Sequence, residues 1–295
     1  MRHKWWFTGL FLAILLFTLV MIVGSGVRLG IEFEGGVRAE VQLNQPASVD
    51  QVRQIVEANG VAGATIQPVG DNAYLVEAKT LSKAEYEAML SDLDAQFGAD
   101  KAAASMEEVG PSFGRETGKK ALIAIIVAIA AIILYISWRF EFKFALPAIA
   151  ALVHDVGLTV AVYAATGRLV TTATVAALLT ILGYSVNDTI IVFDRVRENT
   201  VLMKREPYSY MVDMSIRQTL TRSINTSLTT LLPIGAILFF GGATLKDFAF
   251  ALFIGIAAGT YSSVFVASPL LTLWKEREPR YRRRAAAERE SGSSS

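Results

Sequence analysis

Six long stretches of this chain contain almost only apolar side chains and are separated by segments rich in polar and charged residues. An apolar stretch of about 18 or more residues is long enough to cross the hydrocarbon core of a bilayer as an α-helix. The pattern therefore predicts six transmembrane helices. Their approximate ranges are 6–23, 121–138, 144–165, 171–193, 223–240 and 248–273.

The segment between the first two predicted spans has a different pattern, in which short alternating stretches and amphipathic stretches follow one another. Alternation predicts half-buried strands, and a period near 3.6 residues predicts helices. The predicted elements are, in order, strand 37–43, helix 48–59, strand 64–68, strand 73–78, helix 82–97 and strand 103–109. This βαββαβ order predicts a small α+β domain of the ferredoxin-like type.

Together these patterns predict an α-helical polytopic membrane protein with one small α+β extracytoplasmic domain. The expected parts are a cytoplasmic N-terminus with the first helix (1–24), the α+β domain (25–118), helices two to six (119–273) and a charged cytoplasmic tail (274–295). The first apolar stretch follows a positively charged start, as in a signal peptide. We interpret it as a retained anchor, because it is longer than the usual apolar core of a signal peptide and no convincing cleavage site follows.

Composition and charge fit a membrane protein and give it an orientation. Hydrophobic residues make up 53% of the chain, charged residues 19%, and the mean hydropathy is +0.42, which is too apolar for a soluble domain. The predicted α+β domain has 7 Lys and Arg against 15 Asp and Glu, a net charge of −8, so that the rest of the chain carries +9. Lysine and arginine gather near both chain ends and in the loops after the second and fourth spans. Positive loops stay in the cytoplasm, so both termini are expected there and the acidic domain on the opposite side.

Asp188 lies inside the fourth apolar stretch, and Arg222 stands immediately before the fifth. A charged side chain at the centre of a bilayer costs about 2.5–3.5 kcal/mol on insertion scales, so Asp188 needs a partner or a proton. A small change in the distance between its carboxylate and the Arg222 guanidinium would change how readily Asp188 holds a proton. Alternatively, Asp188 forms a structural ion pair or contacts a neighbouring subunit, and Arg222 extends to the membrane interface.

Further polar residues occupy the other predicted spans. His154 and Asp155 lie near the middle of the third span and form either part of a proton relay or a structural hydrogen bond between helices. In the sixth span Gly255, Gly259 and Ser263 recur at intervals of four, a pattern that lets helices approach closely. The fifth span has polar residues at steps of three or four, which line a water path or hold helices together: Arg222, Asn225, Thr226, Thr229 and Thr230.

Several short motifs occur in this chain in one characteristic order. They are Gly30-Ile31-Glu32-Phe33-Glu34-Gly35-Gly36, Val109-Gly110-Pro111-Ser112, Trp138-Arg139-Phe140-Glu141, Val153-His154-Asp155, Gly183-Tyr184-Ser185-Val186-Asn187-Asp188-Thr189, Asp194-Arg195-Val196-Arg197-Glu198-Asn199 and Gly259-Thr260-Tyr261-Ser262-Ser263. With these motifs the chain resembles, over about residues 1–275, the SecF family of membrane subunits of the bacterial protein-export accessory complex. One motif departs from the family, which usually has Asp-Phe-Thr in place of Glu32-Phe33-Glu34.

The resemblance implies a proton-coupled machine of the resistance-nodulation-division superfamily in the bacterial cytoplasmic (inner) membrane. It implies a pseudo-symmetric six-helix SecD chain, the SecYEG channel and YajC as partners. The substrate it implies is an unfolded preprotein, pulled outward with the energy of the proton motive force. The paired Asp and Arg of the family fall on Asp188 and Arg222, and we add Asn187, Asp155 and His154 as candidate relay residues.

Two other classes of function use membrane-embedded carboxylates. A drug or lipid exporter of related architecture is expected to have a larger exterior part with an apolar pocket. An intramembrane aspartyl protease would pair two carboxylates around a water molecule, but the Gly-x-Gly-Asp sequence of such enzymes is absent. The chain has no cysteine and no nucleotide, zinc or serine-hydrolase motif, so we expect no enzyme activity, cofactor or metal site. The mixed charges of the tail argue against nucleic-acid binding.

Overall fold

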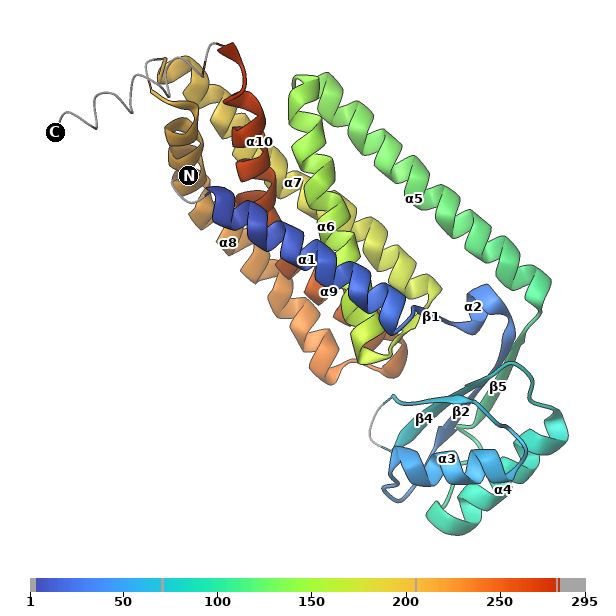
Figure 1. Cartoon of the computed structure of the whole chain (residues 1–295). Coiled ribbons are helices and arrows are strands. Elements are labelled where there is room, and N and C mark those ends of the chain that lie inside the picture. Colours follow the sequence, from blue (N-terminus) through green and yellow to red (C-terminus); the bar gives the residue numbers. More distant parts are fainter. Residues whose placement is uncertain (1–3, 70–71, 205, 280, 282–295) are drawn as a thin grey trace.

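The computed structural model describes residues 4–69, 72–204, 206–279 and 281, and consists of a helical bundle with a small α/β domain at one end (Figure 1). The helices of the bundle are α1 (Lys4–Gly24), α5 (Pro111–Arg139), α6 (Phe142–Thr166), α7 (Thr172–Leu202), α8 (Tyr208–Phe240) and α9 (Ala243–Ser262), which continues through the π-helix η1 (Ser263–Ala267) into α10 (Ser268–Lys275). Within the described ranges, six helical segments are long and apolar enough to cross a membrane. The six predicted transmembrane helices are therefore confirmed.

Two of these helices begin well before their predicted starts at residues 121 and 223. Helix α5 begins at Pro111, with the proline at its first position, and its early turns contain the ion pair Lys120 Nζ–Glu116 Oε1 at 2.8 Å. Helix α8 begins at Tyr208. The hydropathy pattern locates the apolar part of a helix, whereas charged residues with i,i+4 partners continue the same helix beyond it.

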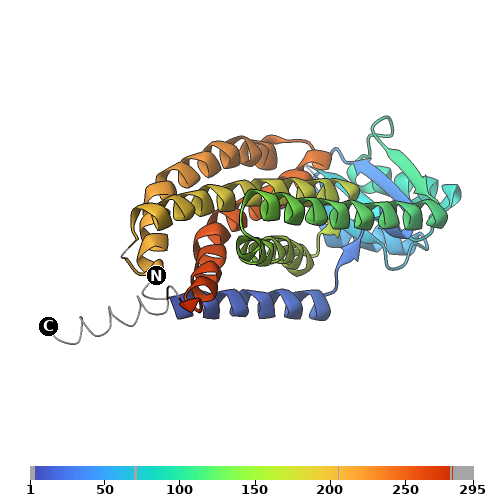
Figure 2. The same cartoon turned by 90° about the horizontal axis from the view of Figure 1, so that it is seen from above.

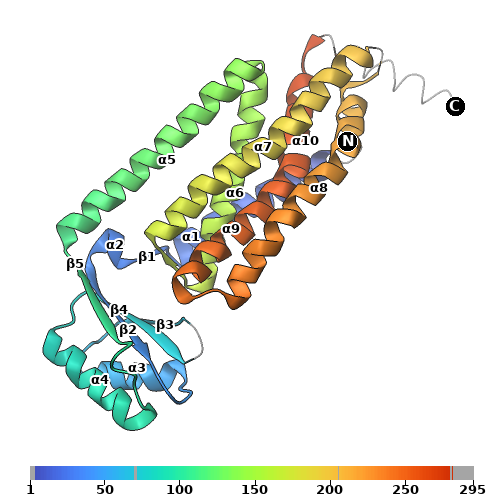
Figure 3. The ribbon, with the colours of Figure 1, turned by 180° about the vertical axis from the view of Figure 1, so that it is seen from behind.

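The core of the bundle lies where α6, α7 and α9 meet. Ala151 of α6, Leu182 of α7 and Ile256 of α9 are each at most 2% exposed. Helix α1 lies on one side of the bundle and α8 on the opposite side (Figure 2). Helix α5 runs from the α/β domain to the far end of the bundle (Figure 3). Most of the apolar side chains of α1 and α5 are exposed in the isolated chain, as expected of helices that face lipid or a partner.

The α/β domain contains β2 (Gly36–Gln42), α3 (Val49–Ala58), β3 (Thr65–Pro68), β4 (Ala73–Ala78), α4 (Lys83–Phe97) and β5 (Ser105–Val109). The strands form an antiparallel sheet in the order β3-β4-β2-β5. Helices α3 and α4 each begin with a capping box, at Ser48 and Ser82. They cover one face of the sheet, which buries Val37, Ala39 and Val41. The predicted βαββαβ order is confirmed, and the strand order is that of a ferredoxin-like domain.

Three short elements connect the domain to the bundle. Strand β1 (Arg28–Leu29) pairs in parallel with β6 (Leu169–Val170), and α2 (Ile31–Glu34) follows β1. After α2 the chain turns at Gly35, whose φ is 78°, and a Cβ atom there would lie 2.7 Å from Pro111 Cα. This position therefore requires glycine. The pattern did not predict β1, β6 or α2, because elements of two to four residues have no measurable period.

Candidate functional site

Asp155 is the centre of a fully buried polar cluster between three helices. It lies near the middle of α6, and its Oδ2 accepts hydrogen bonds from Ser185 Oγ of α7 at 2.6 Å and from Ser262 Oγ of α9 at 2.7 Å. The Nδ1 atom of His154 lies 3.0 Å from Asp155 Oδ1. His154 and Asp155 both have 0% exposure. The structure therefore brings these two predicted residues together and connects α6 to α7 and α9 through one carboxylate.

The His154 ring lies in an aromatic environment. Its centroid is 5.8 Å from that of Phe11 on α1 and 5.9 Å from that of Tyr261 on α9. Its Nε2 atom and the Tyr261 hydroxyl are buried and have no hydrogen-bond partner in the described part of the chain. Two polar atoms without a partner therefore lie next to the Asp155 cluster, and buried groups of this kind are uncommon in proteins.

Asp188 is a second buried carboxylate, 1% exposed, near the middle of α7. The Ser223 hydroxyl of α8 lies beside this carboxylate, and the charge of Arg222 acts on it from a greater distance. Its Oδ2 atom and Ser223 Oγ are buried without a hydrogen-bond partner among the described residues. A buried carboxylate oxygen that lacks a hydrogen-bond partner is costly.

Helix α7 connects the two carboxylates. Ser185, which donates to Asp155, and Asp188 are three residues apart and therefore lie on the same side of the helix. Both are buried. Only the structure places Asp155 of α6 against this side of α7.

Arg222 and Asn187 are exposed in the isolated chain. Arg222 lies about four turns into α8, whereas the hydropathy pattern placed it at the start of a span. Asp188 and Arg222 form no ion pair within 4.0 Å. A direct pair between them therefore stays a prediction, as does a relay role for Asn187.

Small and hydroxyl-bearing residues fill the contacts between α7, α8 and α9. A Cβ atom on Gly255 would lie 2.1 Å from Ile181 Cδ1, and one on Gly259 would lie 3.0 Å from Ser185 Cβ. Ser263 is fully buried in η1, where its Oγ donates to the Thr260 carbonyl at 3.1 Å. The two glycines thus let α9 approach α7 at the level of the Asp155 cluster.

A chain of hydroxyl groups also crosses these three helices. Tyr184 of α7 donates to Ser227 Oγ of α8 at 3.3 Å, and Ser227 Oγ lies 2.6 Å from Thr260 Oγ1 of α9. Of the stripe expected on α8, Asn225, Thr226 and Thr229 are exposed and Thr230 is half-buried. The stripe therefore faces away from this chain, and the inner contacts are made by Ser223 and Ser227.

Sequence reasoning missed Ser262, which donates to Asp155, and Ser223, which lies beside Asp188. Ser262 belongs to one of the short motifs, but nothing in the sequence relates it to Asp155, 107 residues earlier. Ser262 is the last residue of α9, directly before the wide turns of η1, where Ser268 Oγ donates to the Ser263 carbonyl at 2.7 Å. Such π-helical turns interrupt α-helices frequently at functional sites.

Outside the bundle, an ionic cluster lies where the α/β domain meets α2. Arg38 Nη2 lies 2.8 Å from Glu32 Oε1 and 2.6 Å from Glu77 Oε1. Burial raises the pKa of Glu77, and the attraction of Arg38 opposes this shift without cancelling it. Asp247 of α9 adds a repulsion to the Glu77 carboxylate and forms an ion pair with Arg168. The domain is therefore coupled electrostatically to the near end of the bundle.

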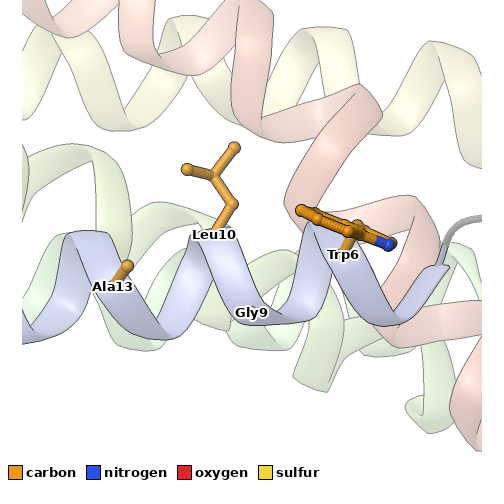
Figure 4. A pocket seen from close by; sticks show the side chains of 4 residues that line it. All are labelled: Trp6, Gly9, Leu10 and Ala13. Atoms are coloured by element: carbon orange, nitrogen blue, oxygen red, sulfur yellow. The ribbon is translucent and has the colours of Figure 1, made fainter.

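The outer face of α1 has an apolar cavity. A cavity of about 510 Å³ opens on the outer face of α1 and is lined by Trp6, Gly9, Leu10 and Ala13 (Figure 4). Trp6 and Leu10 project on the same side of the helix and are exposed. No charged side chain among the described residues lines this cavity, which fits contact with lipid or another helix.

Within the described ranges, no group of three or more His, Asp and Glu side chains is arranged to hold a metal ion.

Comparison with known proteins identifies the family. Residues 89–277 match the family "Protein export membrane protein SecD/SecF, C-terminal", and residues 20–47 match the SecD/SecF GG motif. The chain belongs to the SecD/SecF family. The SecF subunit of the protein translocase of Desulfurispirillum indicum is 40% identical over 280 residues, which cover 91% of this chain and 88% of that protein. The SecDF translocase subunit of Thermus thermophilus is 39% identical over 87% of this chain and 36% of its own length.

Solved structures agree with this assignment. The crystal structure of SecDF from Thermus thermophilus, a translocon-associated membrane protein, matches with a TM-score of 0.83 and 36% identity over 94% of this chain and 39% of that chain. SecDF in a super-membrane-facing form matches with a TM-score of 0.66 and 37% identity. This chain is therefore a SecF-type multi-pass membrane protein with a role in protein translocation, which is a transport role and not an enzymatic one. It spans about two fifths of the SecDF chains that it matches.

Proposed function

We propose that this chain uses the proton motive force, together with a SecD partner, to promote the export of unfolded preproteins through the SecYEG channel. The observation that carries the proposal is the pair of buried carboxylates, Asp155 and Asp188, near the middle of adjacent helices. Ionisable groups at this depth are costly and mark ion pathways by default.

Protonation of Asp155 would change the packing of three helices. As a carboxylate it accepts from Ser185, Ser262 and His154 at the same time. A protonated carboxyl group must donate one hydrogen bond, so at least one of these donors would lose its acceptor or reverse its hydroxyl. Because the donors belong to α7 and α9 as well as α6, this exchange supports a link between proton occupancy and helix position.

The energy available per proton sets a limit on the mechanism. Moving one charge through the membrane potential yields about 2.3 kcal/mol per 100 mV. This is comparable to the free energy of a few hydrogen bonds in a protein interior. A single proton can therefore reverse the Asp155 contacts, and movement of a long polypeptide needs several protons.

The exposed polar surface of α7 and α8 supports a partner subunit. Asn187, Arg222, Asn225 and Thr229 are exposed along the length of helices that are otherwise apolar. Lipid hydrocarbon chains cannot form hydrogen bonds with these polar side chains, so we assign this surface to contact with a pseudo-symmetric SecD chain. The name SecDF of the Thermus thermophilus relative is consistent with this assignment. YajC is a further candidate partner.

The proposed location is the bacterial cytoplasmic membrane with both termini in the cytoplasm. The positive loops and the acidic α/β domain favour this orientation. We keep the division into residues 1–24, 25–118, 119–273 and 274–295 as part of the proposal. The α/β domain then lies outside, where translocated polypeptide emerges.

The test is preprotein export by the chain and its SecD partner in vesicles with an imposed proton gradient. In the variant Asp188→Asn, we expect export to lose its dependence on the gradient while the complex assembles normally. The matched control is Asp194→Asn, which changes an exposed carboxylate on the same helix. Gradient-dependent export by Asp188→Asn at the rate of the unchanged complex would disprove the proposal.

A second arm tests Asp155. Asp155→Asn keeps the shape of the side chain but does not titrate, so it is expected to reduce gradient-dependent export and proton uptake together. Ser262→Ala removes one donor to Asp155 and keeps the carboxylate. We expect this variant to export with an altered dependence on external pH. Equal, full activity of both variants would assign Asp155 a structural role.

A further inference from the structure

A charged pocket lies at the end of the bundle away from the α/β domain. It has a volume of about 360 Å³ and is formed where the α5–α6 turn meets the ends of α7 and α10 and the start of α8. Its lining residues are Arg139, Phe140, Glu141, Phe144, Arg197, Thr200, Tyr208, Lys275 and Tyr281. The relay proposed above does not use it.

Positive charge predominates in this pocket. Three lining side chains are cations and one, Glu141, is an anion. Lys275 is 6% exposed, and its Nζ lies 2.6 Å from Glu141 Oε2. This contact lowers the pKa of Glu141, so Glu141 stays ionised near neutral pH and neutralises one of the three cations.

The two arginines retain binding capacity. Arg139 forms a long contact of 3.3 Å with the exposed carboxylate of Asp194. Arg197 forms no ion pair with any described residue, and its Nη1 donates to the Arg139 carbonyl at 3.4 Å, which holds it at the pocket. Most guanidinium N–H groups of both side chains therefore remain available for an anion.

The base of the pocket contains an unsatisfied polar group. Tyr208 is 1% exposed, and its hydroxyl has no hydrogen-bond partner among the described residues. The Tyr281 ring lies 4.8 Å from the Tyr208 ring. A buried hydroxyl without a partner costs about 1–3 kcal/mol, so a ligand that supplies an acceptor would remove this cost.

We propose that this pocket binds the phosphate group of an anionic phospholipid. A phosphate accepts bidentate hydrogen bonds from arginine and can also accept from a tyrosine hydroxyl. Trp138 and Phe142 flank the α5–α6 turn and are 83% and 69% exposed, as aromatic residues are at a membrane interface. Basic pockets between transmembrane helices at this level bind lipid headgroups. The inference does not depend on the proposed proton relay.

The site also explains why Lys275 is buried beside Phe144, with its Nζ 5.3 Å from the ring centroid. The ammonium group is held by Glu141 and by Glu278, whose Oε1 lies 3.5 Å from Lys275 Nζ, so Arg139 and Arg197 supply the positive charge that is free to bind an anion. Lipid binding would connect Arg139 of α5, Arg197 of α7 and Lys275 of α10 through one ligand. A lipid that occupies the pocket is therefore expected to stabilise this end of the bundle.

The experiment measures phosphatidylglycerol binding to the full chain, purified in detergent and stripped of lipid, by mass spectrometry of the intact complex. The test variant is Arg139→Gln with Arg197→Gln. The control is Arg195→Gln, on the same helix, whose guanidinium is engaged by Glu198 at 2.5 Å and Gln218 at 2.6 Å and does not line the pocket. We expect the test variant to bind at least tenfold more weakly, and the control to bind as the unchanged chain does.

A second variant distinguishes a loss of lipid binding from a loss of folding. Tyr208→Phe removes only the hydroxyl, so it keeps the aromatic packing and is expected to weaken phosphatidylglycerol binding by a few-fold. Phosphatidylcholine, whose phosphate charge is balanced by its choline group, is expected to bind more weakly than phosphatidylglycerol to the unchanged chain and to lose less affinity in the test variant. Equal losses in the test variant and in Arg195→Gln would overturn the proposal in favour of a diffuse basic surface.

Inorganic phosphate distinguishes a lipid from a free anion. We expect phosphate at millimolar concentration to leave phosphatidylglycerol bound, because the acyl chains add apolar contacts that the free ion lacks. Phosphate that displaces the lipid, or that raises the unfolding temperature as much as the lipid does, would show a site for the free ion and overturn the assignment to lipid.

Discussion

The contact between Gly255 of α9 and Ile181 of α7 provides a quantitative test of how closely these helices must approach. A Cβ atom at Gly255 would lie 2.1, 2.5 and 2.9 Å from the Cδ1, Cγ1 and Cγ2 atoms of Ile181, all well inside ordinary van der Waals contact. Ile181 is 1% exposed, so it has no space into which to move. The variant Gly255→Ala therefore has to push the two helices apart or force Ile181 off its rotamer.

Overpacking of this kind costs about 1–3 kcal/mol. In an open position, glycine to alanine in a helix instead gains up to about 1 kcal/mol. Gly183 of α7 is such a position, because a Cβ atom there would meet nothing within 4 Å. We expect Gly255→Ala to lower the free energy of unfolding by about 1–3 kcal/mol, and Gly183→Ala to leave it unchanged or raise it slightly. The measurement is unfolding by SDS titration of the purified chain in mixed micelles.

The compensating variant is Ile181→Ala, which deletes all three atoms that the new methyl group would meet. Alone it is expected to cost about 2–5 kcal/mol, because it leaves a cavity in the core. In the double variant the added methyl enters that cavity, so the combined loss is expected to be at least about 1 kcal/mol smaller than the sum of the single losses. Additive losses, or a stabilising Gly255→Ala, would refute the close approach of α9 and α7 described above.

Three further predictions concern other parts of the chain. Asn199→Ala removes the buried amide that donates to Ser215 Oγ at 2.7 Å and to Gln218, so SDS titration should show a loss of about 1–2 kcal/mol. The pKa of Glu77 is raised in the folded chain, so between the unfolded pKa, about 4.3, and the folded pKa the folded chain binds more protons than the unfolded chain. Stability should therefore fall as pH rises through this window. Thermal unfolding scans at several pH values should show that Glu77→Gln abolishes this dependence. Ser82→Ala breaks the capping box of α4 and should lower stability by about 1 kcal/mol, with faster amide hydrogen exchange confined to the first turn of this helix.

The predicted α/β domain agrees closely with the structure because its signals are local. Ser48 and Ser82 predict helix starts through their own side chains, and both form capping boxes. Strand 73–78 coincides with β4, because alternating residues report which face of a strand is buried. The start of α8 at Tyr208 was missed, since a hydropathy pattern registers where a helix is apolar and not where its hydrogen bonds begin.

In the candidate site too, the sequence identified individual residues, whereas the structure was needed to show which residues contact one another. Asp188 was identified from its charge alone, because a carboxylate in an apolar stretch is unusual wherever it points. Its relation to Arg222 depends on how two helices are rotated about their axes, and the structure leaves Arg222 exposed. Ser262 was not paired with Asp155, because a hydrogen bond between residues that are distant in sequence leaves no periodic trace.

By itself the sequence determined the number of spans, the βαββαβ order and the identity of the buried ionisable residues, because each follows from local hydrophobicity, local hydrogen bonding or the cost of a charge in lipid. The tertiary structure alone decided which helices share the Asp155 cluster, that Asp188 faces Ser223, and that Arg139, Arg197 and Lys275 line one pocket. These relations depend on the crossing and rotation of packed helices, which are set by many weak contacts between distant parts of the chain.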